Sequence, residues 1–305
     1  MRRIANCLLL LLLWGFALPA NAEAPKYVEA PKYVEVAQYT EASKYTETPK
    51  RVITIGGPVT EIAYKLGANG LLVGSDTSSY YPPEAKKLAK VGYQRALSVE
   101  GILSLNADLV LLTEDAGPQA AIKQLNAAKV PMLQLKANRS IDDIIVSIKQ
   151  IGQALNREKE SKQLIAEMTQ KQQNLEKLLN GMKYRPRVLV VHRHMGGAPL
   201  AAGTGTAANS IIALSGGVNV VTEFANYKPL TPEAAAVFRP ELIIIAAPPD
   251  DAIKDESNLA THPVFDQTPA GENGHIYVMD ALEVLGFGPR IIDTAVKLNQ
   301  LYLNL

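Results

Sequence analysis

Cysteine is nearly absent from this sequence, and Cys7 is the only example among 305 residues. It precedes the main apolar run at the N-terminus, whereas the cysteine of a lipoprotein follows such a run, so we do not expect lipidation. A folded chain without disulfides depends on its own apolar core. About 280 residues follow the first 22, which is enough to form such a core.

An excess of charge of either sign is also missing. The chain has 31 Lys and Arg against 30 Asp and Glu, and removal of Arg2 and Arg3 with a leader would leave 29 basic residues. The chain therefore lacks the basic surface with which proteins bind nucleic acid. No long apolar run follows the N-terminal region.

Catalytic motifs are missing as well. No cysteine nucleophile follows residue 22, and residues 203–207 (Gly-Thr-Gly-Thr-Ala) are not a phosphate-binding loop because no Gly-Lys-Ser/Thr follows them. The four histidines do not show the His-x-x-x-His or His-Glu-x-x-His spacing of a zinc site. We therefore expect a binding protein and not an enzyme.

The N-terminus has the three parts of a cleavable signal peptide. Arg2 and Arg3 provide a basic start, residues 8–13 an apolar run, and residues 20–22 (Ala-Asn-Ala) a small-x-small cleavage pattern. The apolar stretch of residues 4–18 is shorter than the ~20 residues of a membrane-spanning helix, which argues against an uncleaved anchor. We therefore predict residues 1–22 as a signal peptide and export of the remainder.

A six-residue repeat follows the predicted cleavage site, in residues 23–50. Tyr27, Tyr33, Tyr39 and Tyr45 recur in it at one position per repeat. Its alternating charges, prolines and scarcity of large aliphatic residues predict a disordered tail. A tether whose tyrosines collect ligand is one interpretation, and a duplicated spacer is the one we favour.

From residue 51 the chain alternates short β-branched runs with helical patterns, which is typical of parallel α/β architecture. The predicted strands form two series along the chain. The first series comprises residues 51–55, 71–74, 109–113 and 132–135, and the second 187–191, 218–222, 242–246 and 275–279.

The two series are related to each other. The segment that begins at Glu100 matches the segment that begins at Glu233, with glutamate, a later acidic residue and a strand in the same register. Arg51-Val and Arg187-Val open the two series in the same way. We therefore predict two similar α/β lobes, at residues 51–139 and 184–305.

Residues 140–183 predict linking helices between the lobes. Ser140 is a helix N-cap before isoleucines at helical spacing, and a longer helix from about Arg157 to Asn180 ends at Gly181. Such a helix of ~24 residues is ~36 Å long and would form a strut behind both lobes. Two lobes joined in this way leave a cleft, and clefts between domains bind small ligands.

One loop contains a candidate ligand for a metal, in the segment Val91-Gly-Tyr-Gln-Arg95. A phenol binds a ferric ion as phenolate, and since the ordinary pKa of a phenol is ~10, the metal and a nearby positive charge must stabilise the anion. Arg95 lies two residues after Tyr93 and would supply that charge. Taken alone, a tyrosine in a loop is more often a packed ring whose hydroxyl faces water.

Three segments resemble the periplasmic haem-binding proteins of bacterial haem-uptake ABC transporters. They are residues 51–62 (Arg-Val-Ile-Thr-Ile-Gly-Gly-Pro-Val-Thr-Glu-Ile), 91–103 (Val-Gly-Tyr-Gln-Arg-Ala-Leu-Ser-Val-Glu-Gly-Ile-Leu) and 285–290 (Leu-Gly-Phe-Gly-Pro-Arg). The resemblance extends from Arg51 to the C-terminus and excludes the six-residue repeat. It implies the class III periplasmic binding protein fold, with two lobes, a helical backbone and the ligand cleft between the lobes. It also implies a periplasmic location.

The same resemblance implies the ligand and its contacts. Haem iron would be bound by Tyr93, with Arg95 as its charge partner, and either His194 or His192 would contact haem from the second lobe. An ordinary surface histidine is the alternative for that last role. Candidate apolar walls are Tyr80, Tyr81, Met195, Tyr227 and Phe287, and candidate partners of the haem propionates are Arg290 and Lys228.

The resemblance further implies that Glu100 and Glu233 contact the two subunits of an inner-membrane ABC permease. The internal repeat supports this assignment independently, because a two-fold permease requires one matching contact from each half. The alternative is that each glutamate only favours the start of its helix. We expect a monomer that carries haem, with a ferric-siderophore or cobalamin carrier of the same fold as the alternative. Whether the cleft holds one haem or two stays open.

Overall fold

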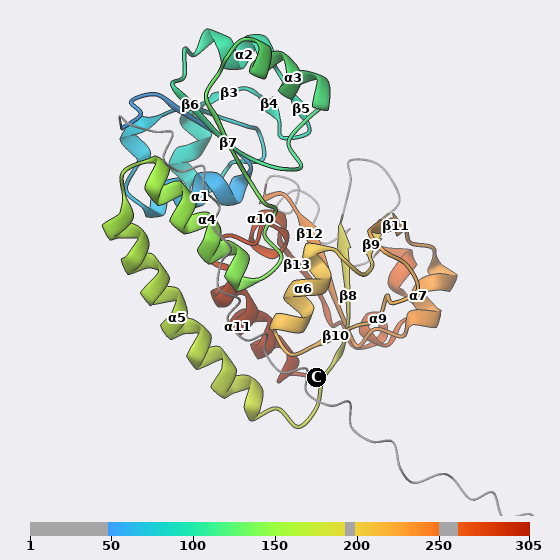
Figure 1. Ribbon diagram of the computed structural model, residues 1–305. Helices are drawn as coiled ribbons and strands as arrows, with labels where there is room; N and C mark the ends of the chain where they lie inside the picture. The colour runs from blue at the N-terminus through green and yellow to red at the C-terminus, as the bar shows by residue number, and fades with distance from the viewer. Residues whose placement is uncertain (1–47, 193–198, 250–261) are drawn as a thin grey trace, which may run out of the picture. The chain divides into compact units, whose positions relative to one another are not determined.

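The computed structural model describes residues 48–192, 199–249 and 262–305 (Figure 1). The predicted signal peptide and almost all of the six-residue repeat lie outside the described residues, and so do His194 and Met195. The rest of the chain forms two α/β lobes, each built on its own sheet.

The sheet of the first lobe is parallel, with strand order β3-β2-β1-β6-β7. Every residue of the adjacent strands β1 and β6 is buried, as expected for a parallel sheet that is covered on both faces. Alternate side chains therefore enter two different cores. The strands are β1 (Val52–Ile55), β2 (Leu72–Ser75), β3 (Ala89–Lys90), β6 (Leu109–Thr113) and β7 (Met132–Leu135).

The sheet of the second lobe has the order β11-β9-β8-β12-β13, and β10 also pairs with β8. Strands β9 and β11, at one end of this order, run antiparallel to their neighbours and were not predicted from the sequence. Strand β10 is also shorter than the predicted strand 218–222. The strands are β8 (Arg187–His192), β9 (Leu200–Ala202), β10 (Val218–Asn219), β11 (Tyr227–Pro229), β12 (Leu242–Ala247) and β13 (Ile276–Asp280).

Short helices and turns connect these strands. In the first lobe they are α1 (Gly57–Lys65), η2 (Asn69–Leu71), η3 (Pro83–Lys87), α2 (Val99–Ser104) and α3 (Gln119–Ala127). In the second lobe they are α6 (Ala207–Leu214), α7 (Pro232–Phe238), η4 (Pro263–Phe265), α9 (Pro269–Asn273), α10 (Ala281–Leu285) and α11 (Ile291–Tyr302).

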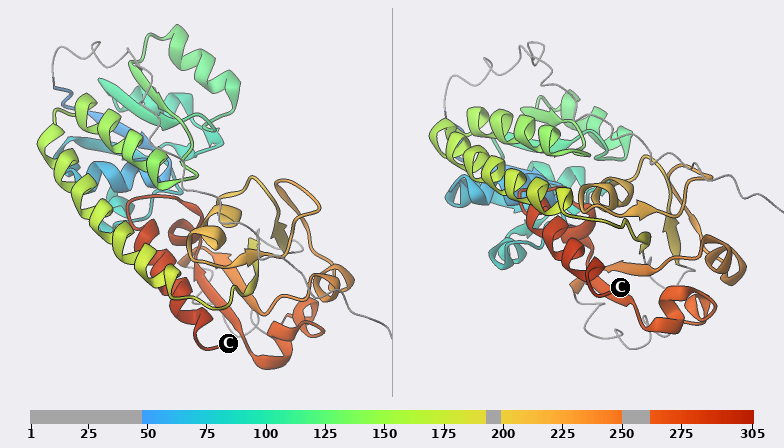
Figure 2. Two further views of the ribbon diagram at one scale, coloured as in Figure 1. Left: turned by 60° about the horizontal axis from the view of Figure 1, so that its bottom comes forward. Right: turned by 90° about the horizontal axis from the view of Figure 1, so that it is seen from below.

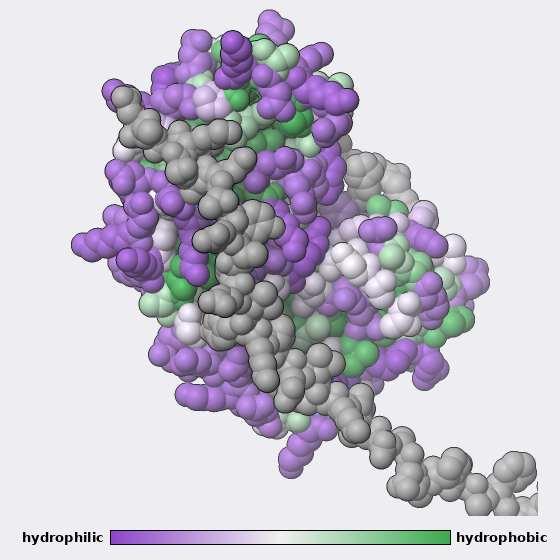
Figure 3. All heavy atoms as spheres, in the orientation of Figure 1, coloured by the Kyte–Doolittle hydropathy of each residue, from purple (hydrophilic) through white to green (hydrophobic). Residues whose placement is uncertain are grey.

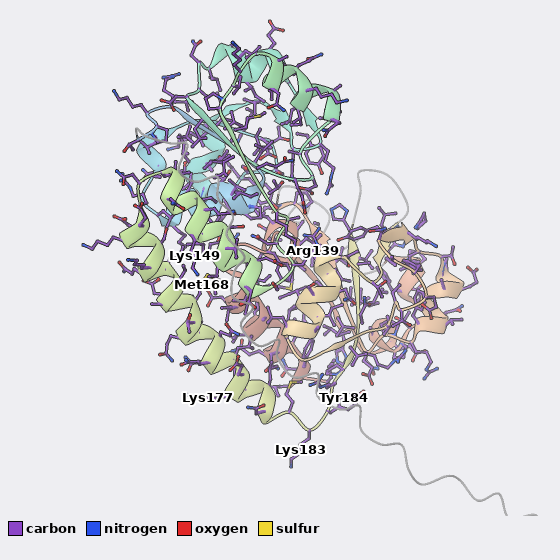
Figure 4. The ribbon with its side chains drawn as sticks, in the orientation of Figure 1. Arg139, Lys149, Met168, Lys177, Lys183 and Tyr184 are labelled. Carbon is purple, nitrogen blue, oxygen red and sulfur yellow. The ribbon has the colours of Figure 1, made fainter. Side chains whose placement is uncertain are left out.

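The linking helices are α4 (Ile141–Ala154) and α5 (Glu158–Asn180). Ser140 is the N-cap of α4, since its Oγ accepts a hydrogen bond from the amide of Asp143 at 3.1 Å, and Gly181 is the C-cap of α5. Helix α5 packs against both α4 and α11 (Figures 1 and 2), and Met168 is buried in this packing (Figure 4). The prediction of a capped helix followed by a long strut is confirmed.

The internal repeat is confirmed by matching hydrogen bonds. The backbone amide of Arg51 donates to the Asp108 carboxylate at 3.0 Å, and the amide of Arg187 donates to the Glu241 carboxylate at 2.8 Å. The guanidinium of Arg51 donates to the carbonyl of Leu105 at the end of α2, and that of Arg187 donates to two carbonyls at the end of α7. Both arginines therefore hold the C-terminus of an equivalent helix.

Contacts between distant parts of the chain join the segment around α10 to the first lobe. Arg290 Nε donates to Glu61 Oε1 at 3.1 Å, and Asn138 Nδ2 donates to the carbonyl of Phe287 at 3.0 Å. The hydroxyl of Tyr80 donates to the Asp280 carboxylate at 2.7 Å. One apolar core includes residues of both lobes, so the two sheets share part of their packing.

Candidate functional site

Tyr93 lies in a short antiparallel hairpin of β4 (Gly92–Tyr93) and β5 (Ala96–Leu97). Gly92 has a φ of +97°, and a Cβ there would lie 2.6 Å from the carbonyl oxygen of Ala96. Only glycine fits this position, which explains why it precedes the tyrosine. The hairpin leaves the Tyr93 side chain 46% exposed, so its phenol is accessible to a ligand.

Arg95 links the phenol of Tyr93 to an acidic residue that sequence analysis missed. Its Nη1 donates to the Tyr93 hydroxyl at 3.4 Å, and its Nη2 lies 2.9 Å from Asp115 Oδ2. The other carboxylate oxygen of Asp115 accepts from Thr113 Oγ1 at 2.6 Å and from Gln94 Nε2 at 2.7 Å. Thr113 and Gln94 thus fix one carboxylate oxygen of Asp115, and the other oxygen binds the guanidinium of Arg95.

The opposite charges of Arg95 and Asp115 stabilise each other. Burial acts to raise the pKa of Asp115, but the hydroxyl of Thr113 and the guanidinium of Arg95 outweigh it and lower the pKa below its ordinary value. Burial acts to lower the pKa of Arg95, and Tyr93 and Asp115 outweigh it in the opposite direction. A positive charge is therefore held permanently beside the exposed phenol.

The second lobe contributes an aromatic pair. Tyr227 is in the edge strand β11, and His192 ends strand β8; their ring centroids are 6.1 Å apart with an interplanar angle of 62°. Tyr227 is 38% exposed. Of the two histidines predicted to contact haem, the structure thus places His192 beside an accessible aromatic ring, and His194 lies outside the described residues.

Positive charges in the first lobe affect the pKa of Tyr227. Burial raises the pKa of Tyr227, while the positive charges of Arg139 and Arg95 act to lower it. Arg139 follows β7 in the segment that leads to α4, where its Nη1 donates to the carbonyl of Asn138 at 2.7 Å (Figure 4). The candidate site therefore comprises five of the described residues, namely Tyr93, Arg95, Arg139, His192 and Tyr227.

Two other sequence-based expectations change. Phe287 is 1% exposed within the core, so it is not a wall of an open cleft. Arg290 pairs with buried Glu61 and lies with its guanidinium carbon 3.5 Å from the centroid of the Tyr81 ring, so it is not free for a propionate. These residues join two parts of the chain that sequence analysis treated separately.

The remaining candidates contact residues outside the candidate site. The hydroxyl of Tyr80 is bonded to Asp280, and Lys228 Nζ lies 4.9 Å from the centroid of the Phe224 ring. Neither contact involves the candidate site. Met195 lies outside the described residues.

Glu100 and Glu233 occupy equivalent positions. Glu100 is the second residue of α2 after the N-cap Ser98, and Glu233 is the second residue of α7 after the N-cap Thr231. Both side chains are exposed. The structure thus presents the two glutamates in the same way in the two lobes.

No helix in residues 48–192, 199–249 and 262–305 is both long and apolar enough to cross a membrane. No cluster of three or more His, Cys, Asp or Glu side chains in these ranges could hold a metal ion.

Two α/β lobes with parallel sheets, joined by linking helices, define the class III periplasmic binding protein fold. The profile of the periplasmic binding protein family matches residues 52–282, and the chain belongs to this family. The structure of the periplasmic heme-binding protein BhuT in complex with two hemes is similar, with a TM-score of 0.77 and 35% identity. This match covers 85% of this chain and 99% of BhuT.

Two other relatives have names that do not mention haem. A vitamin B12-binding protein of Pectobacterium carotovorum is 31% identical over 66% of this chain and 73% of its own length. An ABC transporter substrate-binding lipoprotein of Bacillus subtilis is 27% identical over 82% of this chain and 79% of its own. The chain is therefore a substrate-binding protein of the kind that serves ABC transporters, and the family is not one of enzymes.

Proposed function

We propose that this protein is exported to the periplasm with cleavage of its signal peptide, captures haem there as a monomer, and delivers it to an inner-membrane ABC permease. The observation that carries the choice of ligand is the half-exposed phenol of Tyr93 with the Arg95 guanidinium directed at its hydroxyl oxygen. A phenolate oxygen is a hard anionic ligand that suits ferric iron, and a fixed cation stabilises it. Similarity to BhuT supports the same ligand.

The other residues of the site have roles that suit a porphyrin. Tyr227 and His192 would provide an aromatic surface on the second lobe, and His192 or His194 would reach the haem from that side. The exposed guanidinium of Arg139 would pair with a propionate, the role first expected of Arg290.

A cobalamin carrier is the alternative, and similarity to vitamin B12-binding proteins favours it. Cobalamin already has its axial ligands, so Tyr93 would not bind its metal. A ferric siderophore would likewise leave the phenol without a role as ligand.

Titration with the three ligands tests the proposal. Purified protein is titrated separately with hemin, cyanocobalamin and a ferric siderophore, and binding is followed by visible absorbance and calorimetry. We expect a hemin complex with a ferric tyrosinate spectrum and an affinity at least about a hundredfold above that for cyanocobalamin. Binding of cyanocobalamin or the siderophore without a haem band would contradict the proposal.

Delivery would depend on Glu100 and Glu233, each pairing with a cation on one of the two permease subunits. Their equivalent positions suit a partner with two-fold symmetry.

Asp115 provides a prediction about the site itself. Asp115→Asn removes the charge that holds Arg95, and we expect haem affinity to fall about fivefold, since a partly exposed ion pair contributes about 1 kcal/mol. Asp293→Asn is the matched control, because Asp293 forms an exposed ion pair with Lys171 in the linking-helix region. Equal hemin affinities for Asp115→Asn and Asp293→Asn would show that Asp115 does not position Arg95.

A further inference from the structure

We propose that Leu103 and Val237 form a pair of apolar contacts with the permease, each beside one of the glutamates. This inference rests on the proposed delivery to a two-subunit permease and specifies the surface used. Each lobe would then present one acidic and one apolar side chain to its own permease subunit.

In the first lobe, packing fixes which side of α2 faces outward. Ile102 is 1% exposed and packs in the core, and the Ser98 Oγ accepts from the amide of Gly101 at 3.0 Å to fix the start of the helix. Leu103 follows Glu100 by three residues, so both side chains lie on the same face of the helix. Leu103 is 41% exposed there.

The second lobe has a similar combination in α7, where the apolar residue Val237 lies one position further along the helix than Leu103 does in α2. Ala235 is fully buried in the core, and the Thr231 Oγ1 accepts from the amide of Ala234 at 3.3 Å. Val237 follows Glu233 by four residues, which again places both on one helix face. Val237 is 76% exposed, although valine is a poor helix former.

The two helices are also held alike at their other ends, by Arg51 and Arg187. Apolar surface interrupts the hydrophilic surface near α2 and α3 and again near α7 (Figure 3). An exposed carboxylate beside an exposed apolar side chain is complementary to a cation beside an apolar recess. Because each lobe has such a pair on one of two equivalent helices, a partner with two equivalent subunits fits.

The test measures the affinity of the full mature protein for its cognate ABC permease in lipid nanodiscs. Leu103→Gln, Val237→Gln and the double variant are compared with wild type, with hemin binding and thermal unfolding measured on each. Glutamine favours helix and keeps the side chain long, so the fold is expected to stay intact. We expect each single variant to weaken permease affinity about fivefold and the double variant about twentyfold, with hemin binding unchanged.

Two exposed leucines outside these helices are matched controls. Leu178, 48% exposed on α5, corresponds to Leu103, and Leu303, 76% exposed, corresponds to Val237. Their glutamine variants should bind the permease like wild type. Equal losses in Leu178→Gln and Leu303→Gln, or no loss in the double variant, would overturn the inference. If wild type binds hemin but not the permease, delivery itself fails, which is a different result.

Discussion

Replacing Tyr93 with phenylalanine is expected to abolish the ferric tyrosinate band of the hemin complex and to lower hemin affinity by at least about a hundredfold. Loss of groups that only support a metal ligand costs about 10-fold to 100-fold in affinity, and loss of the ligand itself should exceed this. Phenylalanine keeps the ring and removes only the oxygen. The measurement is a visible spectrum with a hemin titration.

Tyr184→Phe is a suitable control, because Tyr184 is 57% exposed and its hydroxyl bonds only to Glu241 among the interactions described for it. Its hemin spectrum should match that of wild type. Tyr227→Phe should keep the tyrosinate band, since it leaves the Tyr93–Arg95 pair intact. An unchanged band in Tyr93→Phe would rule out Tyr93 as the iron ligand, and loss of the band only in Tyr227→Phe would transfer the role to the second lobe.

The second large effect concerns stability. Arg290→Met is expected to lower the free energy of unfolding by about 3 kcal/mol at pH 7, because it leaves the Glu61 carboxylate buried without its cation. The Glu61 side chain is 3% exposed and that of Arg290 is 20% exposed, so solvent screens this pair little. Methionine keeps much of the length of arginine, so the change mainly removes charge. Denaturant unfolding of the full chain measures the difference.

The pH dependence of the free energy of unfolding shows whether the buried Glu61 charge causes the loss of stability. Burial raises the pKa of Glu61, and Arg290 acts to lower it, so the pKa should rise further in Arg290→Met. A carboxyl group with a raised pKa binds a proton more readily in the folded state than in the unfolded state, so its folded state gains stability as the pH falls. The difference between Arg290→Met and wild type should therefore shrink between pH 7 and pH 5.

Two further variants complete this test. Glu61→Gln/Arg290→Met should recover much of the lost stability, since no buried charge then remains. Lys171→Met breaks the exposed pair with Asp293 and should cost less than about 1 kcal/mol. A deficit in Arg290→Met that is the same at pH 5 and pH 7 and persists in the double variant would attribute the effect to lost packing around Tyr81.

Local patterns in the sequence predicted much of the fold. Strands 109–113 and 132–135 match β6 and β7, and the continuous run of β6 is buried on both faces as a central parallel strand requires. The Ser140 cap and the end at Gly181 followed from chemistry within one helical turn. Strands β9 and β11 were missed because each has three residues, too few to show a period.

The sequence by itself therefore determined the α/β class, the internal repeat, the linking helices and Tyr93 with Arg95 as candidates for the site. These features depend on residues that are close in the chain or on a pattern that occurs twice. Only the tertiary structure identified the acidic partners of Arg95 and Arg290. Asp115 lies 20 residues from Arg95, and Glu61 lies 229 residues from Arg290. No periodicity or cap relates residues so far apart, because tertiary packing brings them together, within the first lobe for Asp115 and Arg95 and between the lobes for Glu61 and Arg290.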